Sequence, residues 1–248
     1  MSATGNRRIY ALGDIHGMIA ALDERLDEIQ TDLAARPHAA PLLICLGDYV
    51  DRGPDSRAVI ETLIEVRNAG WIETVFLLGN HDKLCLDFLS DPTPNATDIY
   101  HWLDAPLGGS ATVASYGVHR ASSRRAGAAH ASFVAAIPPS HRSFLETARL
   151  HFSVGTYLFV HAGIRPGVAL ANQDPDDLIW IRDPFLHSTD DHGQIVVHGH
   201  TVVGAVAVRP NRIGIDTGAV FGGTLSCLVL EDDTRALLAH NTLHPLTG

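Results

Sequence analysis

Short apolar runs in the first half of the chain each end in a glycine followed by a polar residue. The runs are Ile9–Leu12 before GDIHG, Leu42–Leu46 before GDYVDRG, and Val75–Leu78 before GNHD. Apolar stretches of this length, bounded by turn residues and alternating with helical patterns, are typical of strands in βαβ units. The pattern predicts three strands, with one polar motif at the carboxyl end of each.

Two amphipathic helices are predicted between these strands. Apolar residues recur at steps of three and four from Ile19 to Leu33, which is the periodicity of a helix packed on a sheet. A second helix follows Asp55 or Ser56, since either side chain can cap it, and Gly70 is a natural stop.

The stretch from about Ser90 to Ser140 breaks this pattern. It is rich in Pro, Gly, Ser, Ala and His and contains DPTPNATD and ASSRRAGAAHAS. Long irregular stretches in compact domains are often lids over a site, although surface insertions are also tolerated there. We interpret residues 90–140 as an inserted, cap-like segment, and the choice between lid and neutral insertion stays open.

Strand patterns return at Tyr157–Val160, Ile195–Val197, Ile213–Ile215 and Cys227–Leu230, with little helix between them. A helical first half and a strand-rich second half predict an α/β protein with two sheets packed face to face and helices outside, rather than one doubly wound sheet. The 248 residues are compatible with one domain, 1–248, that includes the insertion.

Composition narrows the possible functions. The chain is 46% hydrophobic and 19% charged, which is typical of a packed globule. Its net charge of −10 argues against binding to extended nucleic acid, which needs many basic contacts to phosphates. The three cysteines lack CxxC spacing and are expected to be buried free thiols. No signal-peptide pattern or membrane-length apolar run is present, so we expect a cytoplasmic protein without membrane contact.

Candidate chemistry begins in the first two motifs. Asp14 and His16 are two residues apart at a strand end, so their side chains can share an ion. GDYVDRG gathers Asp48, Asp51 and Arg52 in one turn, and such charges are unfavourable in a cleft unless they are paired. A metal on Asp48 would satisfy this requirement and leave the other two free for other tasks. Taken alone, each motif is also compatible with a surface turn.

The remaining motifs add nitrogen and oxygen donors. GNHD contributes Asn80 as an oxygen ligand and His81 as a titratable acid or base, although the sequence does not say which of the two binds metal. His161 in FVHAG and either His198 or His200 in VVHGHT follow further apolar strands. A single histidine of this kind is usually structural, but five strand ends bearing such donors make coincidence implausible.

A donor set of nitrogen and oxygen without thiolate favours a catalytic pair of first-row divalent ions over a structural zinc site. Two such ions about 4 Å apart polarise a phosphoryl group and generate hydroxide near neutral pH. The sequence therefore predicts phosphoester hydrolysis.

In this order, the motifs resemble the phosphoprotein phosphatase (PPP) family of calcineurin-like metallophosphoesterases, and within it the bacterial and phage-type serine/threonine protein phosphatases. The resemblance extends from Gly13 to about Gly223. It implies a four-layered α/β/β/α metallophosphatase sandwich and two divalent ions, for which manganese is expected and iron and zinc are the alternatives.

The resemblance also implies a role for each matching residue. Six would hold metal: Asp14 and His16 the first ion, Asp48 both ions, and Asn80, His161 and His200 the second. His200 is preferred to His198 because the family places its ligand between Gly and Thr. A metal-bridging hydroxide would attack phosphorus in line. Four residues would act on the phosphoryl group: His81 protonates the leaving oxygen, Asp51 orients His81, and Arg52 and Arg182 hold the phosphoryl oxygens.

Departures from the family pattern limit what can be transferred. The chain has HAG and GNHD where many members have HGG and GNHE, and both changes are mild. Val202 stands where broader metallophosphoesterases have a further histidine, which favours the phosphoprotein phosphatase branch. The long carboxyl-terminal loop of eukaryotic members is absent, so eukaryotic-type regulatory subunits are not expected as partners.

We predict a phosphomonoesterase that removes phosphate from serine or threonine side chains, and tyrosine is a further candidate. Its expected partner is a phosphorylated protein or a small phosphoester substrate. The rival enzyme is a diadenosine tetraphosphate hydrolase. The GDYVDRGP sequence of this chain also fits the pattern of that family. Asp51 favours the phosphatase because it supplies the partner that His81 needs. A metal-stabilised binding module without turnover is a weaker alternative, since a lapsed enzyme need not retain groups that serve only the transition state.

Overall fold

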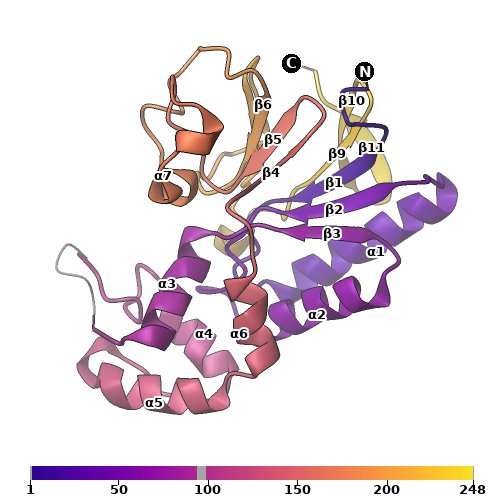
Figure 1. Ribbon diagram of the computed structural model, residues 1–248. Coiled ribbons are helices and arrows are strands. Elements are labelled where there is room, and N and C mark those ends of the chain that lie inside the picture. Colours follow the sequence, from indigo (N-terminus) through magenta and orange to yellow (C-terminus); the bar gives the residue numbers. More distant parts are fainter. Residues whose placement is uncertain (1, 94–98, 248) are drawn as a thin grey trace.

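The strands of the chain form two mixed sheets that pack against each other, with helices on both outer faces (Figure 1). The computed structural model describes residues 2–93 and 99–247. One sheet has six strands in the order β11-β10-β9-β1-β2-β3, and the other has five in the order β4-β5-β6-β8-β7. The predicted α/β sandwich with two mixed sheets flanked by helices is confirmed.

The strands are β1 (Arg8–Leu12), β2 (Pro41–Cys45), β3 (Glu73–Phe76), β4 (His151–Val154), β5 (Tyr157–Val160), β6 (Ile195–His198), β7 (Ala207–Val208), β8 (Arg212–Gly214), β9 (Cys227–Glu231), β10 (Thr234–Ala239) and β11 (Thr242–Pro245). The α-helices are α1 (Ile19–Ala35), α2 (Ser56–Ala69), α3 (Asn80–Ser90), α4 (Gly109–Ser115), α5 (Ala126–Ala136), α6 (Pro139–Glu146) and α7 (Pro175–Trp180). Three short 3₁₀ turns cover Ser123–Arg125, Leu170–Asn172 and Ala219–Phe221.

Parallel pairing brings the motif loops together. β1, β2 and β3 are parallel neighbours, and β5, β6 and β8 form the parallel centre of the second sheet. The carboxyl ends of parallel strands lie at the same edge of a sheet, which is where α/β proteins bind ligands. The loops after these strands therefore converge on one region.

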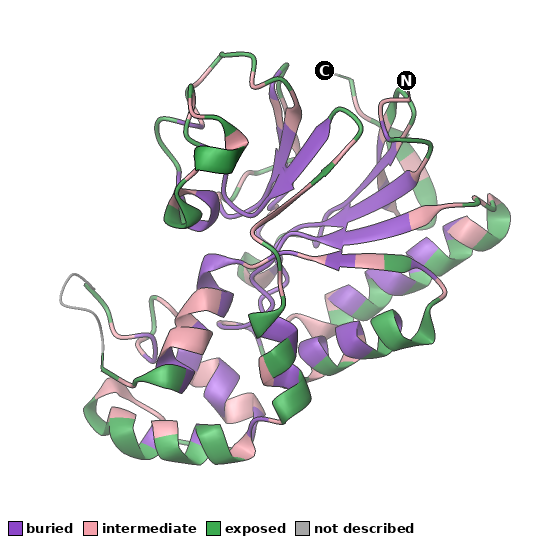
Figure 2. Cartoon of the chain, in the orientation of Figure 1, coloured by how far each residue is buried: buried purple, intermediate pink, exposed green. Residues whose placement is uncertain are grey.

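Alternating side chains on β1 separate two cores. Tyr10 and Leu12 pack toward α1 and α2, whereas Ile9 and Ala11 face the five-stranded sheet. A third core lies between that sheet and α7. β1 is buried on both faces, as the purple of the central strands in Figure 2 shows, and its sequence is accordingly almost continuously apolar.

The two predicted helices are present. The side chain of Asp55 caps α2 by accepting a 2.9 Å hydrogen bond from the Ala58 N–H, and Gly70 ends the helix at φ 65°. The motif GNHD was expected directly after a strand that included Leu78, but β3 ends at Phe76 and Asn80 is the first residue of α3.

The inserted segment contains helices of its own. Between α3 and α6 it contains α4 and α5, which gather beside α3 and α6 at one end of the molecule (Figure 1). Trp102, Val113 and Phe133 are buried in the same core that α1 and α2 form with the six-stranded sheet. The segment is thus part of the main packing, and its residues 94–98 lie outside the described part of the chain.

Two further expectations concern cysteines and membranes. Cys45, Cys85 and Cys227 are buried and carry no disulfide, as predicted. Across residues 2–93 and 99–247, none of the helices combines the length and apolar character needed to cross a bilayer.

Candidate active site

A pocket of about 420 Å³ lies where the strand ends of the two sheets meet. Eight of the ten predicted site residues line it: Asp14, His16, Asp48, Arg52, Asn80, His81, Arg182 and His200. The other two, Asp51 and His161, are fully buried directly behind it. The structure therefore brings together all ten residues that the motifs and the family resemblance predicted.

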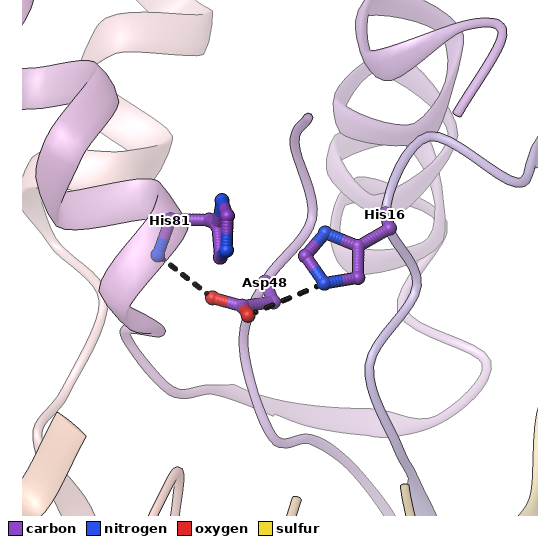
Figure 3. Close-up of side chains that lie close together, drawn as sticks. All are labelled: His16, Asp48 and His81. Atoms are coloured by element: carbon purple, nitrogen blue, oxygen red, sulfur yellow. Dashed lines mark hydrogen bonds and ion pairs between the residues drawn. The ribbon is translucent and has the colours of Figure 1, made fainter. Parts of the chain in front are cut away.

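Asp48 lies at the centre of this group. The backbone N–H of His81 donates to Asp48 Oδ1 at 2.9 Å, and Nε2 of His16 lies 3.4 Å from Oδ2 (Figure 3). Nε2 of His161 approaches Oδ1 to 3.5 Å from the second sheet. One carboxylate is therefore shared by ligand candidates from both sheets.

Backbone carbonyls hold two of the histidine rings in place. Nδ1 of His16 lies 2.7 Å from Val50 O, and Nδ1 of His161 lies 2.9 Å from Leu46 O. A carbonyl oxygen only accepts hydrogen bonds, so Nδ1 of each ring carries a proton, and in the neutral form of the ring an Nε2 lone pair faces the pocket. This is the arrangement that a metal-binding histidine requires.

Asn80 contacts both His161 and His200 through its side-chain oxygen. Its Oδ1 lies 3.0 Å from His161 Nε2 and 2.8 Å from His200 Nδ1. In a neutral His161 ring, a nitrogen lone pair would face the lone pairs of Asn80 Oδ1. A cation between these atoms would turn this unfavourable contact into ligation.

The donor atoms fit two metal ions. Two triads of donor atoms share Asp48, one with His16 and His81 and the other with His161 and His200, and within each triad the atoms lie within 4.8 Å of one another. Asp14 lines the same pocket but belongs to neither triad, and one of its carboxylate oxygens accepts the His200 N–H at 3.1 Å. The nitrogen and oxygen donors suit first-row divalent ions.

Buried negative charge also favours cations here. Burial raises the pKa of Asp14 well above its ordinary value, and the nearby carboxylates of Asp216 and Asp48 raise it further. Burial likewise tends to raise the pKa of Asp48, but the positive charge that His161, His81 and His16 carry when protonated outweighs it and holds this pKa below its ordinary value. A bound cation would stabilise both carboxylates in their charged form.

We expect added manganese to raise the midpoint of thermal unfolding by about 5 to 10 °C. A ligand at a hundred times its Kd stabilises the folded state by about 2.7 kcal/mol, and each kcal/mol shifts the midpoint of a chain this size by about 2–4 °C. Differential scanning fluorimetry with manganese or with excess chelator measures this. Identical midpoints in the two conditions would contradict a metal site among these residues.

His81 and Asp51 form a buried pair beside the metal ligands. Nδ1 of His81 donates to Asp51 Oδ2 at 2.7 Å. Burial lowers the pKa of His81, but the carboxylates of Asp48 and Asp51 outweigh this and leave its pKa above the ordinary value. The ring is thus held in one orientation, at the edge of the pocket, by a partner that favours its protonated form.

The two arginines that line the pocket, Arg52 and Arg182, differ in how deeply they are buried. Arg52 is half-buried and its Nη1 donates to His16 Nε2 at 2.6 Å, whereas Arg182 is exposed at the rim. A metal on His16 would require the Arg52 guanidinium to turn away from this nitrogen. It would then be free to contact an oxyanion in the same pocket.

Left-handed backbone conformations concentrate at the site. Five of the ten non-glycine residues with positive φ in the described part of the chain are predicted site residues: His16, Asp48, Asp51, Arg52 and His200. Such conformations are unfavourable for side-chain-bearing residues and persist where the surrounding structure enforces them, often at functional sites.

His198 and His200 are clearly separated by the fold. β6 ends at His198, whose ring packs against Phe185 at 5.1 Å between centroids. His200 has φ 62° and its ring lines the pocket. Residues two apart in a strand point to the same side. The left-handed backbone at His200 breaks this alternation, so the rings of His198 and His200 lie in different places.

Several site residues were missed by the sequence reasoning. Asp82 is fully buried and accepts hydrogen bonds from the backbone N–H groups of Asp48, Tyr49 and Gly79. Asp216 lines the pocket near Asp14. Asp82 belongs to the GNHD motif and Asp216 directly follows the predicted strand Ile213–Ile215, so the rule of polar residues after strands would have found both. Trp102 and Thr112, which contact Asp51, belong to no such motif.

The family comparison agrees with this geometry. Residues 7–219 match the family model described as calcineurin-like phosphoesterase. The chain belongs to the calcineurin-like phosphoesterases. Members of this metallophosphoesterase family use a binuclear metal centre, which is the site that the two triads around Asp48 can form. The family predicted from the motifs is confirmed.

Relatives of this phosphoesterase have more than one activity in their names. The chain is 29% identical to an asymmetrical bis(5'-nucleosyl)-tetraphosphatase of Anoxybacillus flavithermus, covering 88% of each chain. It is also 29% identical to serine/threonine-protein phosphatase 1 of Salmonella typhimurium, covering 89% of this chain and 90% of that one. These similarities support a phosphoesterase and leave its substrate class unresolved.

A solved structure shows the same fold. The cold-active protein-tyrosine phosphatase of a psychrophilic Shewanella superposes with a TM-score of 0.63 at 17% identity, covering 98% of this chain and 81% of that one. At this level of identity, the likeness concerns the sandwich fold of the phosphoesterase alone.

Proposed function

We propose that the chain is a manganese-dependent phosphomonoesterase that acts on phosphorylated protein side chains. The observation that carries this proposal is the buried His81–Asp51 pair at the edge of the pocket. Hydrolysis of a phosphoserine or phosphothreonine expels a strongly basic alkoxide, which needs a proton in the transition state. A nucleotide leaving group departs as a weakly basic phosphate and needs that proton far less.

The site residues would have three distinct roles: metal binding, binding of the phosphoryl oxygens and proton donation. Asp14, His16, Asp48, Asn80, His161 and His200 would hold the two ions, which polarise the phosphoryl group and lower the pKa of water when they are bound. Arg52 and Arg182 would hold the phosphoryl oxygens as charge develops. His81 would give a proton to the leaving oxygen, while Asp51 keeps its ring in the required orientation.

The rim of the pocket also suits a peptide. Three of the six exposed large apolar side chains in the described residues, Trp180, Val202 and Phe221, line this pocket. Exposed apolar side chains around a polar centre are typical of binding surfaces. They would contact residues that flank a phosphorylated side chain, while the polar floor holds the phosphate.

A dinucleoside tetraphosphatase is the second candidate. It is favoured by the 29% identity to the asymmetrical tetraphosphatase over 88% of each chain. The exposed Trp180 and Phe221 would serve as stacking surfaces for a base in that case.

A substrate panel tests the two candidates directly. With manganese, we expect kcat/KM for phosphoserine, phosphothreonine or phosphotyrosine peptides to exceed that for diadenosine tetraphosphate by at least about tenfold, or about 1.4 kcal/mol. The reverse ranking would establish the tetraphosphatase. Failure to hydrolyse any of these compounds, or p-nitrophenyl phosphate, would contradict both.

The pH dependence should report the His81–Asp51 pair. A raised pKa keeps His81 protonated to higher pH, so the rate falls as the pH rises through that pKa. Asp51→Asn removes a carboxylate that stabilises the charged ring, and its alkaline limb should therefore move to lower pH. Profiles of kcat against pH for the two proteins measure this shift. A limb that stays in place would mean that another group controls it.

A further inference from the structure

We propose that Trp102 and Thr112, from the inserted segment, are positioning residues that hold the Asp51 carboxylate and thereby orient His81 toward the leaving group. The inference rests on the proposed function, because it assigns the segment a part in the same proton transfer. It makes the segment a support for the proton donor rather than a lid or a neutral insertion.

The first observation is how fully Asp51 is bound. Its Oδ2 accepts from His81 Nδ1 at 2.7 Å and from Trp102 Nε1 at 2.8 Å, and its Oδ1 accepts from Thr112 Oγ1 at 2.7 Å. Asp51 is 0% exposed. Two of the three side chains that hold this carboxylate therefore come from residues more than fifty positions away in the inserted segment.

The same segment fixes the backbone of the Asp51 turn. The Asp51 N–H donates to Thr112 Oγ1 at 2.8 Å, and the Arg52 N–H donates to Gly108 O at 3.2 Å. Both residues have left-handed backbones, which need such support. The hydroxyl group of Thr112 thus contacts both the backbone N–H and the carboxylate of Asp51.

Packing fixes the direction of the Trp102 N–H. A Cβ on Gly109, the first residue of α4, would lie 2.4 Å from Cδ2 and Cε2 of the indole, so only glycine allows this contact. Phe88 packs against the same indole at 4.8 Å between centroids. Turning the Nε1–H away from Asp51 would disrupt the contacts of the indole with Gly109 and Phe88.

Neither residue can act on a substrate directly. Trp102 is 5% exposed and Thr112 0%, and neither lines the pocket that contains His81. The side-chain hydrogen bonds of both residues reach the pocket residue His81 through Asp51. Loss of a partner that orients a functional side chain typically lowers a rate by about 10- to 100-fold.

The dependence of kcat on the leaving group distinguishes a positioning role from a general disturbance of the active site. Phenyl phosphate releases a basic phenoxide that needs the proton from His81, whereas dinitrophenyl phosphate releases a stable anion that does not. We expect Trp102→Phe and Thr112→Val to lower kcat for phenyl phosphate by about 10- to 100-fold and to leave kcat for dinitrophenyl phosphate within about twofold. KM and the two bound manganese ions should be unchanged.

Matched variants complete the experiment. Thr112→Ser restores the hydroxyl and should recover most of the rate. Trp71→Phe removes an indole that lines a separate pocket between α1 and α2, and Gly127→Ala adds a methyl group to α5 where no atom lies within 4 Å. Both controls should resemble the parent protein. Circular dichroism identifies folded variants, and since Thr112→Val is nearly isosteric, it tests the inference if Trp102→Phe fails to fold.

The outcomes are distinct. Equal loss on both esters, or no loss on either, would overturn the positioning role in a protein that remains an active phosphoesterase. If the parent protein with manganese hydrolyses neither ester, the proposed function fails and the positioning role fails with it.

Discussion

His81→Asn is expected to lower kcat for phosphopeptides by about two to four decades, the usual contribution of a positioned general acid. Asparagine has no titratable proton, yet its backbone N–H can still donate to Asp48 Oδ1, as the His81 N–H does at 2.9 Å. The site should therefore keep two equivalents of manganese. Steady-state kinetics, with metal analysis of the same sample, measures both quantities.

His130→Asn is a suitable control for this substitution. His130 is half-buried on α5, and its ring contacts the carbonyl of Leu89 outside the pocket. We expect its kcat to match that of the parent protein. If His81→Asn were equally active while metal-loaded, His81 would have no place in the proton transfer.

Asp48→Asn is expected to abolish activity by a different route, through loss of metal. Asp48 is the one residue common to both triads of donor atoms, and a neutral amide replaces its charge and one of its two oxygens. Metal affinity should fall by more than the roughly 10- to 100-fold that loss of an outer partner causes. Metal content after dialysis and activity at increasing manganese concentration measure the effect.

Asp55→Asn is the matched control, since it makes the same chemical change in the same loop. Asp55 caps α2, and asparagine caps helices about as well as aspartate. This variant should keep its metal and its rate. Two tightly bound equivalents of manganese in Asp48→Asn would show that Asp48 does not bridge the ions. The contrast between His81→Asn and Asp48→Asn thus separates proton transfer from metal binding.

Local patterns predicted the elements that carry most of the site. Strands before GDIHG and GDYVDRG, the helix that follows Asp55 or Ser56, and its end at Gly70 all follow from short-range rules. Apolar periodicity, caps and glycine turns act over a few residues, so they can be recognised without knowing the fold. The motif residues were identified for the same reason.

The helices of the inserted segment were less visible to these rules. α5 reads AGAAHASFVAA, which is rich in alanine and has little alternation between apolar and polar faces. Such a helix forms through the intrinsic preference of alanine and through burial of Ala129 and Phe133, not through an amphipathic stripe. The periodicity that identified α1 therefore gave no signal there.

The sequence alone determined the fold class, the family and the ten residues that converge on the pocket, because strand patterns and compact motifs are written in neighbouring positions. The tertiary structure decided which residues support them. It turned His200 rather than His198 into the pocket through a left-handed turn, and it placed Trp102 and Thr112 on Asp51 across 51 and 61 positions of chain. Hydrogen bonds between distant segments depend on how the helices pack, and no local pattern records that packing.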